Sequence, residues 1–222
     1  QADIRRAAKE FLALDRPLHV LWNNAGVINL NRQTTVDGLE MTFAVNHIGP
    51  FLLTSLLLGR LRESGAARVV ATASGAYRFG GALDFDDLQA ESGYKSFRVY
   101  GRSKLANILF TEELARREAK HGITANSFHP GFVASDLGKN NGRLARILMT
   151  LGAPLARSPV RGAQTGLYLC TSPEAGQLSG LYFGNGKPHS IGSGSQRPGD
   201  AEKLWQVSLE LTGLSSGDRE AS

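Results

Sequence analysis

The stretch Arg68-Val69-Val70-Ala71-Thr72-Ala73-Ser74 decides the fold. It is a short apolar run rich in β-branched residues, which is typical of a buried strand, and it ends in a hydroxyl side chain. On its C-terminal side, residues 100–120 have the apolar spacing of a helix that Gly122 closes, and 123–128 form a second apolar run. On its N-terminal side, residues 51–61 are helical in pattern and 18–22 resemble a buried strand.

This alternation extends along the chain. Residues 4–12, 36–47, 162–170 and 201–211 also have helical patterns, and 181–183 predict a last short strand. Strands that alternate with helices favour a parallel sheet covered on both faces. We therefore predict an α/β fold, a doubly wound Rossmann-like parallel sheet, in one domain that spans residues 1–222. Ligands of such sheets bind beyond the carboxyl ends of the strands.

Composition narrows the function classes. With 41% hydrophobic and 20% charged residues, the chain is typical of a globular domain. No apolar run approaches the length of a membrane span, and no signal peptide is visible, so we expect a cytoplasmic protein. The single cysteine, Cys170, excludes an internal disulfide and a metal site built on several cysteines, and we expect no metal.

The net charge of +5 has a local origin. Lys139, Arg143, Arg146, Arg157 and Arg161 lie in one segment without an acidic residue. Nucleic-acid binding is disfavoured because the excess charge is confined to this stretch. The segment favours a site near a cofactor phosphate, an acidic ligand or a membrane face, or else a solvated helix face. Because residues 138–161 are also apolar, peripheral membrane contact through them is one expectation.

Tyr100 and Lys104 form the central motif. Residues four apart on a helix share a face, and a nearby ammonium lowers the pKa of a tyrosine, so that the hydroxyl can exchange a proton with a substrate oxygen. Ser74 ends its strand where a hydroxyl can donate to a substrate carbonyl. Asn46 is a polar residue in an apolar helix, directly before Gly49-Pro50, a pair that should distort the helix.

Small residues follow two strands. Asn23-Asn24-Ala25-Gly26 ends the first strand and lacks bulk, so a flat ligand can approach its backbone, although an ordinary turn explains the same residues. Pro130-Gly131-Phe132-Val133 follows the strand at 123–128 and can line a ligand. His129 beside it is interpreted as structural, since no second metal ligand has suitable spacing.

Taken in their order along the chain, these residues resemble the short-chain dehydrogenase/reductase family over nearly its whole length. The order is Asn23-Asn24-Ala25-Gly26, Asn46, Ser74, Tyr100 with Lys104 four residues later, and Pro130-Gly131. Val45-Asn46-His47-Ile48-Gly49-Pro50, Ser103-Lys104-Leu105-Ala106-Asn107 and Gly162-Ala163-Gln164-Thr165 resemble its retinol-dehydrogenase-like branch. The interval of 26 residues between Ser74 and Tyr100 fits that branch as well.

The resemblance implies catalytic roles for four residues. Tyr100 would be the general acid in reduction and the general base in oxidation, and Lys104 would lower its pKa and bond the nicotinamide ribose. Ser74 would orient the substrate oxygen, and Asn46 would position a water that links Lys104 to solvent.

The resemblance also implies a cofactor, NADP or NAD, with NADP slightly favoured. It would be bordered by a set that includes Tyr100 and Lys104 and the strand-end residues Asn23, Ala25, Gly26, Pro130, Gly131, Val133 and Ser135. The implied reaction moves a hydride between this cofactor and an apolar alcohol, aldehyde or ketone. A homodimer is a further expectation, and the alternative is a binding or regulatory protein without turnover.

One departure from the family pattern concerns the cofactor loop. The family opens with a strand, a Gly-x-x-x-Gly-x-Gly turn and a helix, and no such turn precedes Asn23; the run Gly184 to Gly194 follows the last strand and is no substitute. We therefore expect an N-terminally incomplete sheet with the first three strands missing, a fragment or misassigned start, and weak cofactor binding by these 222 residues alone.

Overall fold

A five-stranded sheet forms the centre of the computed structural model, which describes residues 1–133, 156–192 and 194–214. The order is β1-β2-β3-β4-β5, with β1 at one edge. The first four strands are parallel, and β5 is antiparallel to β4. The strands are β1 (Val20–Asn23), β2 (Arg68–Thr72), β3 (Thr124–His129), β4 (Tyr182–Gly184) and β5 (Lys187–His189).

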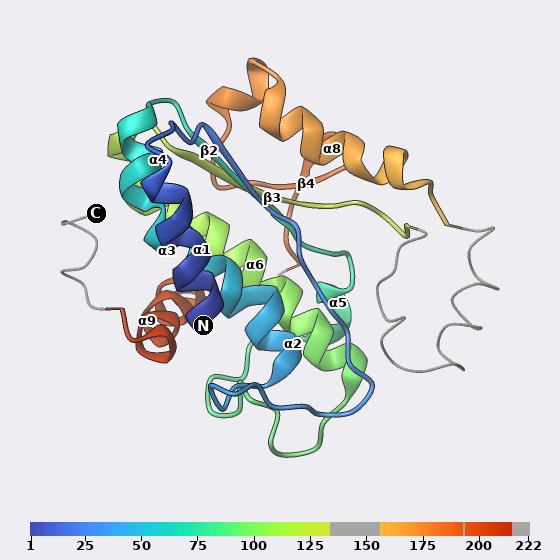
Figure 1. Ribbon diagram of the computed structural model, residues 1–222. Helices are drawn as coiled ribbons and strands as arrows, with labels where there is room; N and C mark the ends of the chain where they lie inside the picture. The colour runs from blue at the N-terminus through green and yellow to red at the C-terminus, as the bar shows by residue number, and fades with distance from the viewer. Residues whose placement is uncertain (134–155, 193, 215–222) are drawn as a thin grey trace.

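Helices cover both faces of this sheet, which confirms the predicted doubly wound class (Figure 1). One face carries α1 (Ala2–Ala13), α3 (Gly49–Leu56), α4 (Leu58–Ser64), α6 (Ser96–Glu118) with its continuation η2 (Ala119–His121), and α9 (Asp200–Thr212). The opposite face carries α8 (Pro159–Thr171), which the 3-10 helix η5 (Glu174–Gln177) follows. Gly166 brings α8 close to the sheet, because a Cβ there would lie 2.5 Å from the Trp22 ring.

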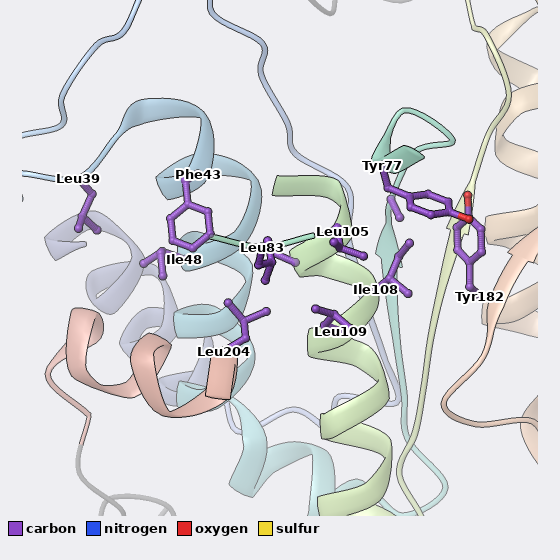
Figure 2. Packing of buried hydrophobic residues seen from close by; sticks show 12 residues of the cluster. Leu39, Phe43, Ile48, Tyr77, Leu83, Leu105, Ile108, Leu109, Tyr182 and Leu204 are labelled. Carbon is purple, nitrogen blue, oxygen red and sulfur yellow. The ribbon is translucent and has the colours of Figure 1, made fainter. Parts of the chain in front are cut away.

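The core gathers around α6. Leu105, Ile108, Leu109 and Leu114, the predicted apolar side of this helix, are all at most 2% exposed. Leu105, Ile108 and Leu109 belong to one buried cluster, in which Phe43, Ile48 and Leu204 lie on one side of α6 and Tyr77 and Tyr182 on the other (Figure 2). This packing fixes the face of α6 that points toward the strand ends.

The helix predicted over 36–47 was wrong in its first turn. A turn at Thr35–Gly38 precedes it, in which the Thr35 hydroxyl accepts from the backbone N–H groups of Asp37 and Leu39, and Gly38 has φ +80°. The short helix α2 (Met41–Phe43) begins only after Glu40, whose carboxylate accepts from the N–H groups of Thr42 and Phe43. A local hydroxyl-capped turn therefore competes successfully with the helical pattern.

The predicted distortion at Gly49-Pro50 is confirmed. Residues Ala44–Ile48 form a π-helix, η1, in which the N–H of Gly49 donates to the carbonyl of Ala44, five residues back. Pro50 has no N–H and its ring crowds the preceding turn, so the regular helical pattern cannot continue through it. Asn46 lies in the middle of this widened turn.

Other boundaries also differ from the prediction. The helix expected at Tyr100 starts four residues earlier, at Ser96, and α5 (Tyr77–Gly80) lies in a stretch expected to be loop. The glycine-rich stretch after β4 contains β5. The chain turns back between the two strands at Asn185-Gly186, where both residues have positive φ. Such a pair is typical of a tight hairpin turn, so the sequence did carry the signal.

The helix expected over 51–61 is broken at Leu57. Among the described residues, no single helix is long and apolar enough to cross a membrane. Met41–Leu56 and Leu58–Ser64 meet the length and composition criteria only when taken together, and they are bent by 54° at the break.

Candidate active site

Four polar side chains lie on one face of α6, toward the carboxyl end of β2. Tyr100, Ser103, Lys104 and Asn107 follow the spacing of helical neighbours, and each is at most 7% exposed. Polar side chains at this depth require partners. The contacts that they make define the candidate site.

The Lys104 ammonium binds the end of β2. Its Nζ donates to the carbonyl oxygen of Thr72 over 2.9 Å, and Asn107 Nδ2 donates to the same oxygen over 3.4 Å. Burial disfavours the charged form and lowers the pKa of Lys104 to about 8. The same Nζ lies 5.8 Å from the centre of the Tyr100 ring.

Tyr100 lies beside Ser74, as the catalytic prediction requires. Burial raises the pKa of Tyr100 above its usual value, and a hydrogen bond with the Ser74 side chain opposes that rise. We expected Lys104 to lower the pKa of Tyr100. Instead the pKa is raised, because the ring is only 7% exposed and its desolvation is the largest effect on this pKa. Ser74 is half-buried, and its Oγ also accepts from the N–H of Ala76 over 3.2 Å.

Asn46 joins this face of α6 to the loop after β1. Its Oδ1 accepts from the N–H of Val27 over 2.7 Å, and its Nδ2 donates to the Val27 carbonyl and to Ser103 Oγ, each over 2.9 Å. Ser103 in turn donates to the Tyr100 carbonyl over 2.7 Å. Because both amide hydrogens of Asn46 have protein acceptors, its side chain acts as a clamp between α6 and Val27.

Gly26 lies directly over the site. A Cβ at this position would lie 3.1 Å from Lys104 Nζ and 3.3 Å from Asn46 Oδ1, so these two polar atoms flank the glycine backbone. Ala25 beside it is exposed. Asn23 differs from its neighbours because its side chain is buried and donates to Thr54 Oγ1 of α3 over 2.9 Å. Its amide therefore fastens the strand end to α3.

Residues Pro130–Val133 follow β3, and Arg157, which lies just before α8, holds them in place. The Arg157 guanidinium lies against Gly131, which has φ +81°, and the Phe132 carbonyl accepts from the Arg157 N–H over 2.7 Å. Val133 pairs with Arg157 in an isolated bridge and packs against Gly162. Ser135 and most of the segment 138–161 lie outside the described residues.

The sequence did not single out two members of the network. Thr72 supplies the carbonyl for Lys104, and its hydroxyl donates to Asn24 Oδ1 and accepts from Trp22 Nε1. Ser103 supports Asn46. Ser103 carried a usable signal, since it is a polar residue on the helix face of Tyr100 and Lys104; Thr72 gave none, because its backbone oxygen is the functional group.

The fold and this site match one family of proteins. A family model described as short chain dehydrogenase matches residues 1–144, so the chain belongs to the short-chain dehydrogenase family. Within that family it is similar to the retinol dehydrogenases: it is 46% identical to mouse retinol dehydrogenase 12 over 211 residues and 43% identical to human retinol dehydrogenase 14 over 214 residues. Both findings confirm the predicted resemblance.

The two alignments cover 95% of this chain, which spans 66% and 63% of the length of these two relatives. Solved structures agree with the fold. An uncharacterised protein of Mycobacterium paratuberculosis is 31% identical, with a TM-score of 0.71 over 96% of this chain and 72% of its own. A short chain dehydrogenase of Burkholderia cenocepacia, solved in complex with NADP, is 22% identical, with a TM-score of 0.58 over 81% of this chain and 69% of its own.

Proposed function

We propose that the protein is a nicotinamide-dependent oxidoreductase in which Tyr100 transfers a proton to or from a substrate oxygen. One observation carries this proposal: Tyr100, whose hydroxyl is close enough to the Ser74 side chain for Ser74 to lower its pKa, lies on the same helix face as the buried Lys104, whose ammonium is 5.8 Å from the Tyr100 ring. A hydroxyl pair of this kind can hold a carbonyl or alcohol oxygen between two donors. Family membership supports the same reaction class.

Each residue then has a defined task. Ser74 orients the substrate oxygen, and Tyr100 Oη donates the proton in reduction and accepts it in oxidation. Since burial raises the pKa of Tyr100, its hydroxyl is protonated at neutral pH, which suits a proton donor. Asn46, through Ser103 and Val27, keeps the loop after β1 next to Lys104.

The residues present fit a nicotinamide cofactor. Gly26 lies close to the Lys104 ammonium and has no side chain, so a ligand can approach the backbone at this point. Among the described residues Lys104 Nζ donates to Thr72, which leaves donors of the ammonium for a ribose hydroxyl. The nicotinamide supplies or accepts the hydride when bound.

Tyr100, Lys104, Ala25, Gly26, Pro130, Gly131 and Val133 would border the nicotinamide half of the cofactor; Ser135 belongs to the same proposed set and lies outside the described residues. The side chain of Asn23 would act indirectly, because it is bound to α3. We take NADP as the first cofactor to test and NAD as the second.

An apolar substrate fits the surroundings of the site. Phe79, Phe97 and Phe132 are 75%, 67% and 63% exposed, and they follow β2, begin α6 and follow β3. Large exposed apolar side chains that follow the carboxyl ends of two neighbouring strands favour an apolar ligand. The similar proteins are named retinol dehydrogenases, and this supports an apolar alcohol, aldehyde or ketone as substrate.

The test replaces the proton donor. In the full-length protein, Tyr100→Phe should lower kcat about a hundredfold to ten-thousandfold for reduction of an apolar aldehyde with NADPH, because the acid is removed. Tyr182→Phe is the matched control: Tyr182 is buried and its hydroxyl has no hydrogen-bond partner among the described residues, so its loss should leave turnover unchanged. Unchanged turnover in Tyr100→Phe would instead support a binding protein without turnover.

Two partners also belong to this proposal. We infer a homodimer, and light scattering during gel filtration measures its mass; a monomer at all concentrations contradicts it. We also infer peripheral membrane contact through residues 138–161, a segment that contains both basic and apolar residues. Flotation with vesicles that contain phosphatidylserine tests this contact, and failure to float contradicts it.

A further inference from the structure

A cavity of about 450 Å³ lies between α8 and the turn that joins β4 to β5. Its volume falls in the range of small-molecule sites, roughly 300 to 1,000 Å³. It belongs to the part of the molecule where α8 runs beside β4 (Figure 1). None of the residues that line it takes part in the contacts of Tyr100, Lys104 and Asn46.

One wall of this cavity is a polar stripe on α8. Arg161, Gln164, Thr165 and Tyr168 are spaced as neighbours on one helix face, and all four line the cavity. The Thr165 hydroxyl accepts from the N–H of Gly186 over 3.1 Å, so the helix and the hairpin turn are joined at this point. The polar stripe on α8 therefore lines one side of the cavity, and the turn between β4 and β5 lines another.

Arg157 contributes to the second wall and is held in place. Its backbone N–H donates to the Phe132 carbonyl over 2.7 Å, and its Nη1 donates to Asn185 Oδ1 over 2.6 Å. The guanidinium lies against Gly131, where a Cβ would be 3.0 Å from it. A guanidinium carries several further N–H donors, and a fixed one loses little freedom when it binds an anion.

The described lining of the cavity is positively charged. Among residues 1–133, 156–192 and 194–214, no Asp or Glu lines the cavity and no salt bridge involves Arg157 or Arg161. Two guanidinium groups in one hollow repel each other, and an anion between them removes that repulsion. Phosphate matches the geometry because its oxygens accept paired N–H donors from arginine.

We propose that this cavity binds a phosphate group, with Arg157 and Arg161 as its cationic partners and Gln164 and Thr165 as neutral hydrogen-bonding partners. The remaining volume and the Tyr168 ring leave room for an organic body attached to the phosphate. The ligand is therefore a small phosphate ester or the phosphate of a dinucleotide. This proposal does not depend on the oxidoreductase activity.

The test titrates inorganic phosphate into the 222-residue chain by calorimetry at low ionic strength. The double variant Arg157→Gln/Arg161→Gln should bind phosphate at least about tenfold more weakly than the unchanged chain, because both charge-assisted partners are lost. Arg197→Gln removes an exposed arginine from a different cavity, beside α9, and should bind as the unchanged chain does. Equal affinity in all three proteins, or no binding by the unchanged chain, overturns the proposal.

Because Arg157 also supports Gly131 and Asn185, its loss can affect folding. Arg161→Gln alone avoids those contacts and should by itself weaken phosphate binding severalfold; unchanged binding in this variant also contradicts the site. Competition then identifies the source of the phosphate. If NADPH displaces inorganic phosphate from the unchanged chain, the group belongs to a dinucleotide; if phosphate stays bound in the presence of NADPH, the ligand is a separate phosphate ester.

Discussion

At the scale of single residues, the site depends on polar groups that have left water. Asn46, Ser103 and Lys104 are at most 3% exposed, and each has a short hydrogen bond to a backbone or side-chain oxygen. Burial of a polar group costs free energy, and breaking its hydrogen bond would leave the full desolvation cost of the group uncompensated. Buried polar groups with hydrogen bonds are therefore held rigidly. The rigidity is what a proton-transfer site requires.

Lys104 gives the first prediction at this scale. Its pKa is lowered from 10.5 to about 8 in the fold, so between these values the unfolded chain holds a proton that the folded chain has released. The unfolding free energy should therefore rise as the pH rises from about 8 to 10.5, by about 3 kcal/mol in total. Denaturant unfolding at several pH values measures it.

Lys104→Met should remove this rise, because the variant has nothing to titrate there. Ser103→Ala serves as the control: it breaks a neighbouring hydrogen bond and lowers stability, but it retains the ammonium and should retain the rise with pH. A slope in Lys104→Met equal to that of the unchanged protein would show that another group causes it.

The sequence predicted Tyr100, Lys104 and Ser74 as one centre, because these residues stand at recognisable positions in a helix and at a strand end. It did not predict which contacts set their pKa values and hold their neighbours in place. The raised pKa of Tyr100 and the binding of Asn23 to Thr54 depend on burial and on neighbours distant in the chain.

At the scale of elements, two glycines set the distance between α5 and α6. A Cβ at Gly101 would lie 2.6 Å from the Ala76 carbonyl oxygen and 2.7 Å from the Gly80 nitrogen, and one at Gly80 would lie 2.6 Å from the Arg102 nitrogen. The two helices therefore meet backbone to backbone. This contact keeps the loop that carries Ser74 next to Tyr100.

Gly101→Ala should accordingly affect both stability and turnover. The added methyl meets backbone atoms that cannot rotate away, so we expect a loss of about 1 to 3 kcal/mol in unfolding free energy. We also expect a fall in kcat, since Ser74 and Tyr100 would move apart. Thermal unfolding and steady-state kinetics measure the two effects.

Gly192→Ala is the matched control, because a Cβ there meets open space and the backbone does not have positive φ. It should change neither quantity. Full turnover in Gly101→Ala would mean that the contact between α5 and α6 does not position Ser74.

The existence of most elements followed from the sequence, and their limits did not. Hydrogen bonds from nearby N–H groups to Thr35 and Glu40 delay the start of the helix expected over 36–47, and Asn185-Gly186 form a hairpin after the strand that was expected to be the last. Local hydrogen bonds of this kind compete with periodicity at every boundary.

At the scale of the whole molecule, a buried histidine links the fold to pH. His47 lies among the rings of Phe43, Phe51 and Phe110, and its Nε2 is 2.8 Å from Ser208 Oγ of α9. Complete burial lowers its pKa from 6.5 to about 3. The folded protein thus holds this ring neutral at mildly acidic pH.

Acid should therefore unfold the protein in part through His47. Between pH 6.5 and 3 the unfolded chain binds a proton that the folded chain excludes, so the unfolding free energy should fall as the pH falls, with His47 responsible for about 5 kcal/mol. His47→Gln should flatten this part of the pH profile. Ser208→Ala should keep the slope while lowering stability, and equal slopes in all three proteins would contradict the assignment.

The sequence by itself determined the sheet class and the family, because these depend on periodicity and on residues at strand and helix ends. It also predicted Tyr100, Lys104, Ser74 and Asn46 as the catalytic residues, and this assignment stays a prediction. Only the tertiary structure decided the protonation balance of the site, the clamp of Asn46 between Val27 and Ser103, and the meeting of Arg157 with Arg161 at one cavity. These features arise from burial and from contacts between residues far apart in the chain, and no local pattern encodes them.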